Sequence, residues 1–448
     1  MPGAASPHRS LTGLLRRLVR GRGTLFTIFA GTSKLRELRP VMAALMGLCP
    51  LDEERVIANY EKAFARAAGV RHAFSFASGR MALYVLLEAL GIGPGDEVIV
   101  PAFTCVVVPN AILYRGARPV YVDIDPGTFN IDVSQVEARI SSRTRAIIAQ
   151  HTFGLICDID GITQLAARYK LAVLEDCAHS LGATHRGRAC GSLGTAAFFS
   201  TDHTKVINTG TGGMLTTDDD ALAGRIASIY HRTPFPPAVR IRTLLAAFVV
   251  EVLLLHPRVA AVGRYLCGLF WRLTLDCAYF LDELRVSKPT TYPYPARLSS
   301  PQAKIGLTQL SDLSANLAWR RHAAAAYEAE MGACAGLLEA GAQNHAFLRY
   351  TFLVANRQAW EAHFHEVLDM GVWYTSVAAG RDRDLHEIRY QPGSCPRAEM
   401  VARHCVNLPT HPRVNRPERL VERLRSARRT NAVELRLLGA PIAESARP

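Results

Sequence analysis

The chain has 448 residues, of which 49% are hydrophobic and 20% are charged. This length and balance exclude a disordered protein and allow two or three domains around a buried core. The 52 Lys and Arg residues against 39 Asp and Glu residues give a net charge of +13, which favours an anionic partner: a phosphorylated cofactor, a nucleotide-linked substrate, acidic lipid or nucleic acid.

The cysteines are scattered. None of the ten forms a CxxC pair with another, so neither a zinc knuckle nor a secreted disulfide framework is indicated. We therefore expect a reduced, cytoplasmic setting and no metal.

Residues 1–50 are predicted to form a basic N-terminal segment. Within it, residues 10–22 place leucines at helical spacing with the arginines mostly off that stripe, the pattern of an amphipathic helix. Such a helix either docks on its own domain or contacts a membrane surface or a partner. Arg16 and Arg17 precede a short apolar stretch and faintly imitate an export signal, but no clear cleavage site follows.

Residues 51–235 alternate between strand-like apolar runs and helical patterns. A helix is expected over residues 82–90, and strands are expected over residues 97–100, 120–123, 146–149 and 172–175. This alternation is typical of βαβ units, so the sequence predicts an α/β fold with a mainly parallel central sheet covered on both faces.

Residues 236–286 form a hydrophobic helical insertion. Residues 244–255 are apolar except for Glu251, and residues 259–271 are apolar except for Arg264. Neither run reaches the roughly 20 residues that a spanning helix needs. A pair of buried helices is one interpretation, and a hairpin on a membrane surface, with residues 240–275 in contact, is the other.

Residues 287–448 are predicted to form a smaller C-terminal domain of mixed α and β structure. Helical patterns cover residues 302–326 and 417–425, whereas residues 379–400 are polar with little periodicity.

Two segments of the larger domain carry reactive side chains. The apolar run 171–174 is followed by Glu175 and Asp176. Ligands of open α/β folds bind where strands end in this way, although a helix cap is the alternative for Asp176. A second run delivers Ser200 and Lys205 into a glycine-rich loop. Only a deprotonated lysine amine attacks an aldehyde, so burial or nearby cations must destabilise its ammonium form. A solvated surface lysine is the alternative.

A third segment, Ser78-Gly79-Arg80, is a small-residue turn at the start of a helix. Free N–H groups and the positive helix end at such a turn favour phosphate. Together the three segments supply a phosphate cradle, a carboxylate and a lysine in the order that a pyridoxal 5'-phosphate (PLP) site requires. Asp176 would keep the pyridine nitrogen of PLP protonated, and Lys205 would be the base that moves the substrate proton.

From about Asn59 to Arg425 the chain resembles the sugar aminotransferases of the DegT/DnrJ/StrS type, which are fold-type-I PLP enzymes. The matching motifs are 93–101 (GPGDEVIVP), 122–125 (VDID), 175–179 (EDCAH), Phe199-Ser200 with Lys205 five residues on, 210–213 (GTGG), 302–310 and 407–409 (NLP).

The resemblance implies a role for each site residue. It makes Lys205 the Schiff-base lysine, Asp176 the pyridine partner and Ser200 a phosphate ligand together with the turn at Ser78, Gly79 and Arg80. His179 stands where the family has Gln or His near the phenolic oxygen of the cofactor.

Several positions depart from the family. Cys105 stands where an aromatic residue usually stacks on the cofactor ring, so the stack is either missing or supplied by Phe103. Arg80 replaces a common Thr and adds a cation to the phosphate turn. Pro295 replaces an Asn that is often lent to the neighbouring subunit, and Thr211 replaces a frequent Glu. These changes leave the lysine chemistry intact and affect the choice of substrate.

The resemblance further implies a homodimer that transfers an amino group, usually from glutamate, to a nucleotide-linked keto-sugar in surface polysaccharide, glycoconjugate or secondary-metabolite biosynthesis. A PLP-dependent sugar dehydratase is a rival, but that branch is expected to carry His where this chain keeps Lys205. A non-catalytic member that binds PLP or sugar for regulation is a second rival. Nucleic-acid binding is not expected, because no basic stripe with interleaved aromatic residues appears. His151 and Asp158 are interpreted as structural residues or as residues that support the site indirectly, with a catalytic role as the alternative.

Overall fold

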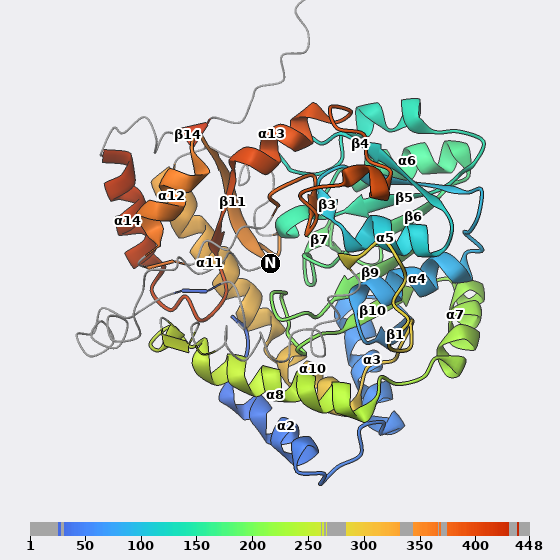
Figure 1. Cartoon of the computed structure of the whole chain (residues 1–448), viewed down its shortest axis with the longest axis horizontal. Coiled ribbons are helices and arrows are strands. Elements are labelled where there is room, and N and C mark those ends of the chain that lie inside the picture. Colours follow the sequence, from blue (N-terminus) through green and yellow to red (C-terminus); the bar gives the residue numbers. More distant parts are fainter. Residues whose placement is uncertain are drawn as a thin grey trace, which may run out of the picture.

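The computed structural model describes residues 26–27, 31–260, 262–263, 266, 284–331, 344–365, 367–368, 374–429 and 437–438. Its centre is a seven-stranded sheet in the order β1-β10-β9-β6-β5-β2-β4 (Figure 1). The strands are β1 His72–Phe76, β2 Glu97–Pro101, β4 Arg118–Val122, β5 Thr144–Gln150, β6 Ala172–Asp176, β9 Ala196–Ser200 and β10 Gly213–Thr217. Only the pairs made by β10, with β1 and β9, are antiparallel among these. The predicted mainly parallel sheet is confirmed, and its four predicted strands correspond to β2, β4, β5 and β6.

Helices cover both faces of this sheet. Helices α4 Gly79–Ala89, α5 Val107–Tyr114 and α7 Asp220–Arg232 pack together on one face, and α3 Glu54–Ala68 and α6 Ile159–Tyr169 cover the other. Successive strand residues alternate between the faces: Ile147 packs in the cluster beneath α6, whereas Ile148 packs in the cluster beneath α4. Both faces are therefore apolar, which explains the continuous apolar runs in the sequence.

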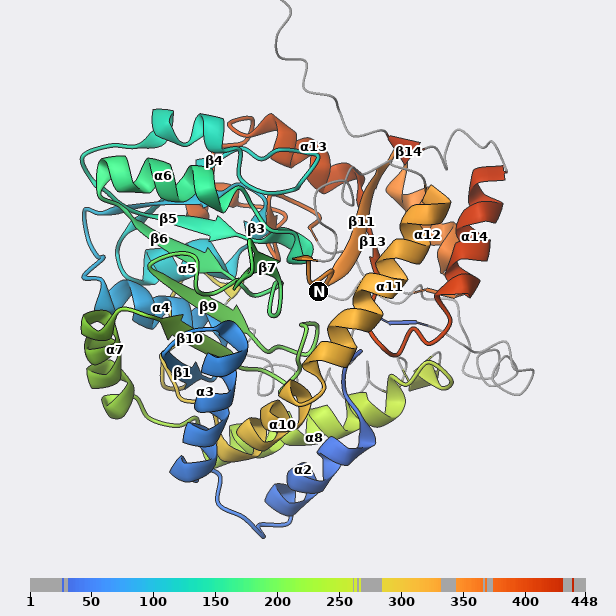
Figure 2. The same ribbon diagram turned by 180° about the vertical axis from the view of Figure 1, so that it is seen from behind.

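The C-terminal region has a smaller antiparallel sheet. Strand β11 Arg349–Val354 pairs with β13 Cys405–Pro409 and β14 Leu437–Leu438. Helices α11 Leu313–Met331, α12 Arg357–Phe364, α13 Pro396–His404 and α14 Pro417–Arg429 belong to the same region. Seen from behind, α11 runs from α10 (Ser300–Leu310) towards this sheet (Figure 2).

The helix predicted over residues 302–326 is two helices, because α10 Ser300–Leu310 ends before α11 begins. Ser311 caps the end of α10, and its hydroxyl donates to the Thr308 carbonyl oxygen at 2.7 Å. Such a bond offers the backbone an alternative to the continued helix. The polar stretch 379–400 contains a short helical turn and the start of α13, which its weak periodicity did not predict.

Short elements connect these layers. They are η1 Leu35–Glu37, α2 Leu38–Leu45, β3 Thr104–Cys105, η2 Val133–Gln135, η3 Glu137–Arg139, η4 Thr152–Gly154, β7 Thr184–His185, β8 Arg188–Ala189, β12 Ala378–Ala379 and η7 Leu385–Ile388. The pairing of β3 with β12 is parallel and joins the C-terminal region to the loop after β2.

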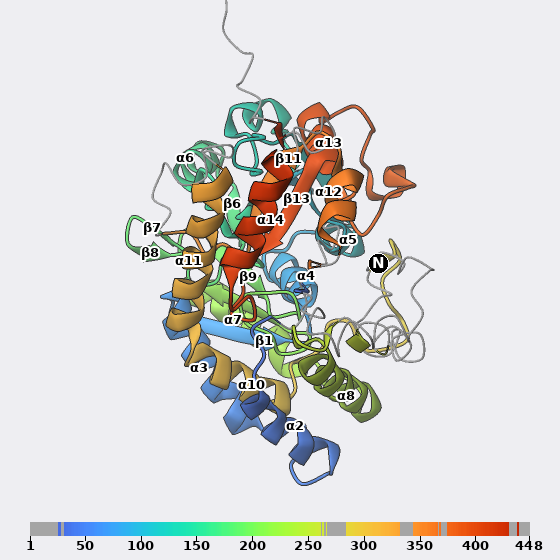
Figure 3. The same ribbon diagram turned by 90° about the vertical axis from the view of Figure 1, so that its left-hand side faces the viewer.

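Among the described residues of the insertion, the long helix is α8 Ala238–Leu254, and one face of this helix is buried. Its inner face packs with α2 and α10 in one apolar cluster that includes Phe248, Val252, Val41 and Ile305 (Figure 3). This packing agrees with the buried-helix interpretation for the first of the two predicted helices. The second falls mostly outside the described residues, as does the predicted amphipathic helix 10–22, so contact with a membrane stays a prediction.

Among the described residues, no helix has the length and apolar character needed to cross a membrane. The domain boundaries predicted at residues 50, 235 and 286 also stay predictions.

Candidate active site

The site lies where the parallel strands β6 and β9 end. Asp176 is the last residue of β6 and pairs in register with Phe198 of β9, so Ser200, two residues on, ends its strand at the same edge. Ser200 in turn pairs with Gly213 of β10. Because the carboxyl ends of parallel strands form the ligand-binding edge of an open sheet, the fold places Asp176 and Ser200 as the sequence predicts.

Asp176 is a buried carboxyl group. Its side chain is 6% exposed, and its Oδ1 accepts a hydrogen bond from the Ala178 N–H at 3.0 Å. Burial raises the pKa of Asp176 to about 6, although the Ala178 bond and the charge of Lys205 act in the opposite direction. A positively charged group beside Asp176 would therefore stabilise its ionised form.

Lys205 lies in the loop after β9, and its backbone N–H donates to the Asp202 carbonyl oxygen at 2.9 Å. Burial lowers the pKa of the Lys205 amine, and the Arg349 guanidinium adds to this effect; the charges of Asp202, Cys105 and Asp176 oppose it. The lowered pKa increases the fraction of neutral, nucleophilic amine. The Lys205 amine therefore lies within electrostatic range of Asp176 and Cys105.

Glycines bring three segments of the site into contact. A Cβ atom added to Gly79 would lie 2.9 Å from the Phe199 carbonyl oxygen and 3.1 Å from the Ser200 Cβ. A Cβ atom added to Gly213 would lie 2.4 Å from the Gly79 nitrogen. Only glycine fits these two positions without a backbone shift, so the turn before α4 is held directly against the end of β9.

This turn suits a phosphate group. Ser78 caps α4 and accepts the Met81 N–H at 3.3 Å, and the half-buried Arg80 lies in the first helical turn. The positive end of α4, the Ser200 hydroxyl and the lysine loop thus face one region. A phosphate at the turn, an acid for a ring nitrogen and an amine of lowered pKa fit PLP in both charge and kind.

His179 is set up as a neutral hydrogen-bond donor. Its ring lies parallel to the Phe153 ring within 9°, with centroids 6.1 Å apart, and its Nδ1 accepts the Phe153 N–H at 3.1 Å. Burial holds the pKa of His179 well below its usual range, and Lys205 and Arg349 lower it further. A neutral imidazole that accepts at Nδ1 carries its proton on Nε2, the arrangement needed to donate to a phenolic oxygen.

Cys105 lies at the junction with the C-terminal region. Its Sγ lies 3.7 Å from the Ala379 carbonyl oxygen, across the pairing of β3 with β12. Phe103 is fully buried and stacks on Tyr374. In the structure the Phe103 ring thus stacks on another side chain of the protein. Tyr374 belongs to the same region, although the sequence did not predict it.

Arg349 is the other residue that sequence reasoning missed. It is the buried first residue of β11, and its charge acts on Lys205 and His179. Neither Arg349 nor Tyr374 carries a local sequence signal, because both reach the site through long-range packing.

His151 and Asp158 make contacts of the kind expected for structural or supporting residues. The His151 ring donates from Nε2 to Glu175 at 3.2 Å, and Glu175 also accepts N–H groups of Gly191, Leu193 and Gly194. These bonds tie the following loop to the end of β6. Asp158 caps α6 by accepting the Gly161 N–H at 3.0 Å.

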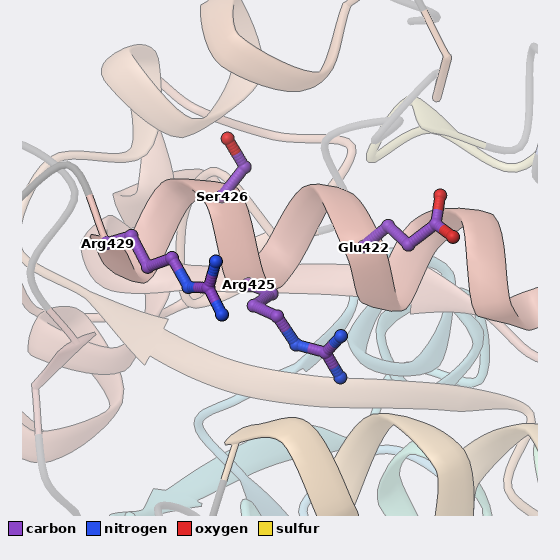
Figure 4. A pocket seen from close by; sticks show the side chains of 4 residues that line it. All are labelled: Glu422, Arg425, Ser426 and Arg429. Atoms are coloured by element: carbon purple, nitrogen blue, oxygen red, sulfur yellow. The ribbon is translucent and has the colours of Figure 1, made fainter.

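A surface hollow on α14 shares no residue with this site. It is lined by Glu422, Arg425, Ser426 and Arg429 (Figure 4). Arg425 is already paired with Glu330 of α11 at 2.9 Å, and none of the four residues that line the hollow is a lysine.

The family model of the DegT/DnrJ/EryC1/StrS aminotransferases matches residues 50–234 and 282–425, more than half of the chain. GDP-perosamine synthase of Caulobacter vibrioides is 51% identical over 172 residues, which are 38% of this chain and 46% of that protein. This chain thus aligns with less than half the length of that relative.

Two other proteins match over most of their length. The pleiotropic regulatory protein of Geobacillus stearothermophilus is 29% identical over 394 residues, covering 85% of this chain and 92% of that protein. The crystal structure of DesV from S. venezuelae, solved in complex with a ketimine intermediate, is 26% identical, with a TM-score of 0.65 and coverage of 87% of this chain and 95% of that one.

These matches confirm the fold class, the family resemblance and PLP as the cofactor of the family. They leave the individual site residues and the substrate to be proposed. The chain belongs to the DegT/DnrJ/EryC1/StrS aminotransferase family.

Proposed function

We propose that this protein is a PLP-dependent aminotransferase that moves an amino group, from glutamate, to a keto-sugar carried by a nucleotide. The observation that supports it most strongly is the electrostatic interaction between the Asp176 carboxyl group and the Lys205 amine. The buried Asp176 carboxyl has a raised pKa, the Lys205 amine has a lowered pKa, and the charge of each acts on the other.

Lys205 and Asp176 would have different roles in the reaction. When bound, PLP supplies an electron-accepting ring that weakens the Cα–H bond of the amino donor. Lys205 Nζ would hold the cofactor and, when its amine is free, would accept the proton from the donor Cα and deliver it to the cofactor carbon. Asp176 would keep the ring nitrogen protonated.

The remaining residues bind and orient. Ser78, Gly79, Arg80 and Ser200 would hold the phosphate, and His179 Nε2–H would donate to the phenolic oxygen. Cys105 lies beside this region without an aromatic ring to stack.

A nucleotide-linked keto-sugar is proposed as the acceptor on two grounds. The chain carries a net charge of +13, which favours an anionic ligand such as a diphosphate. Part of the chain is also similar to a protein named GDP-perosamine synthase. The family resemblance adds a homodimer, which size measurements in solution would test.

Spectroscopy with amino donors tests the proposed activity. Purified protein mixed with PLP should absorb in the visible range, and glutamate should bleach that absorbance, which a keto-sugar nucleotide then restores. A colour that no amino donor changes would instead support a non-catalytic binding protein. Lys62→Ala, at an exposed position of α3, is the matched control for Lys205→Ala; only the second should remove both colour and turnover.

A further inference from the structure

Helix α8 lies outside the family match yet reaches the loop that carries Lys205. The matched residues stop at 234 and resume at 282, whereas α8 spans Ala238–Leu254. Its Glu251 is fully buried and accepts a hydrogen bond from His203 Nδ1 at 3.1 Å. His203, the hydrogen-bond partner of Glu251, thus stands two residues before Lys205 in the sequence.

His203 is held between two acids. Its Nδ1 faces Glu251, and its Nε2 lies 3.4 Å from Asp202 Oδ1. Burial works to lower the pKa of His203, but the Asp202 and Glu251 carboxylates outweigh it and raise the pKa to about 9. Lys205 opposes this rise, so the charges of His203 and Lys205 act on each other. The two acids therefore favour the imidazolium form of His203, which lies in the same loop as Lys205.

Arg413 anchors the end of α8 that carries Glu251. The Arg413 charge acts on Glu251 and on Glu37 of η1, and the Arg413 guanidinium donates to the carbonyl oxygens of Ser33 and Val252 at 3.1 and 2.9 Å. These contacts fix the end of α8 that carries Glu251.

The other part of α8 touches the glycine loop. A Cβ atom added to Gly210 would lie 3.2 Å from Leu244 Cδ1. The helix therefore packs along the loop that includes Lys205 and Gly210 at more than one point.

We propose that Glu251 is a positioning residue, which holds His203 as a cation against the lysine loop and thereby sets the orientation and the protonation of the Lys205 amine. This inference rests on the proposed role of Lys205. It gives the insertion a task in the reaction, in place of packing alone.

The test is the pH titration of the visible absorbance of the protein with PLP bound, in Glu251→Gln and His203→Gln. Loss of the nearby cation should raise the titration midpoint of the lysine–cofactor bond in both variants, by about half a pH unit or more. The kcat for glutamate should fall about tenfold while KM changes little. Glu251→Asp keeps a carboxylate near His203, so it should raise the midpoint less than Glu251→Gln does. Arg242→Gln, at an exposed position of α8, should match the wild type.

The double variant decides whether the two residues act as a unit. If Glu251 works through His203, the double variant should show no larger shift than either single variant. An unchanged midpoint, a lowered one, or shifts that add would each overturn the inference. The proposed function fails separately, if Lys205→Ala keeps the absorbance.

Discussion

The Tyr374 ring stacks on the Phe103 ring, with centroids 4.1 Å apart and ring planes 23° from parallel. Burial raises the pKa of the Tyr374 phenol, and the charges of Cys105 and Asp176 add to this effect. The stacked pair therefore stands beside Cys105 and Asp176, and it joins the C-terminal region to the edge of the central sheet where the site lies.

Removing Phe103 should unfold the chain more easily. Its side chain is fully buried between Phe129, Phe153 and Tyr374, so Phe103→Ala should lower the free energy of unfolding by about 3–5 kcal/mol. Urea titration of the cofactor-free protein measures this. Phe103→Leu should lose clearly less, and Tyr169→Ala, at a 42% exposed position, should change little. A Phe103→Ala variant with the same free energy of unfolding as the wild type would contradict a stabilising role for the stacked pair.

Replacing Gly213 should damage the phosphate turn. A Cβ atom there would lie 2.4 Å from backbone atoms of Ser78 and Gly79, and backbone cannot move aside as a flexible side chain does. Gly213→Ala should weaken PLP binding at least tenfold, about 1.4 kcal/mol, in an absorbance titration with PLP. Gly224→Ala is the matched control, since nothing lies within 4 Å of the added atom. Equal PLP affinity in the two variants would contradict the proposed cradle.

Ionisation of Asp176 should lower the free energy of unfolding of the cofactor-free chain as the pH rises. The folded pKa of about 6 lies above the ordinary value of 3.8, so the folded chain binds this proton more tightly than the unfolded chain does. Stability from this group is present below pH 3.8 and is lost between pH 3.8 and about 6. Asp176→Asn should therefore raise the free energy of unfolding at pH 7 by about 1–3 kcal/mol, with little gain at pH 4.

The measurement is urea unfolding of both proteins without PLP at the two pH values. The same variant should lose most of its aminotransferase turnover, because an amide cannot hold the ring nitrogen protonated. A variant less stable than the wild type at pH 7 would show that the buried carboxylate is stabilised rather than strained.

His179 should be replaceable by another donor but not by an apolar side chain. The Phe153 N–H fixes its Nδ1 as the acceptor, so its function depends on the proton at Nε2. We expect His179→Gln to stay within about tenfold of wild-type kcat and His179→Leu to fall about a hundredfold. The visible absorbance maximum of the PLP-bound protein should shift only in His179→Leu. Similar kinetics and spectra in the two variants would remove this role.

The strands and the site segments could be predicted from the sequence because their signals are local. The run 171–176 shows both its burial and its terminal acid, and the spacing of Ser200 and Lys205 is short. The helix break at Ser311 was missed because apolar periodicity continues across it, while the end of α10 depends on one capping side chain.

The contacts that complete the site could not be predicted in this way. Glu251 and His203 are 48 positions apart, and Tyr374 meets Phe103 only because β12 pairs with β3. From the sequence, Glu251 interrupts an apolar run without indicating its partner. The departure at Cys105 shows that an aromatic ring is absent there, but only the fold shows which rings lie nearby.

Attachment of PLP to one lysine is the central claim, and chemical trapping measures it directly. Borohydride reduction of the PLP-loaded protein makes the lysine–cofactor bond permanent, and peptide mass spectrometry then locates it. We predict that the added mass lies on Lys205 alone and that glutamate added before reduction prevents the labelling. Added mass on another lysine with Lys205 unmodified, or no added mass in a protein that turns over substrate, would contradict the account.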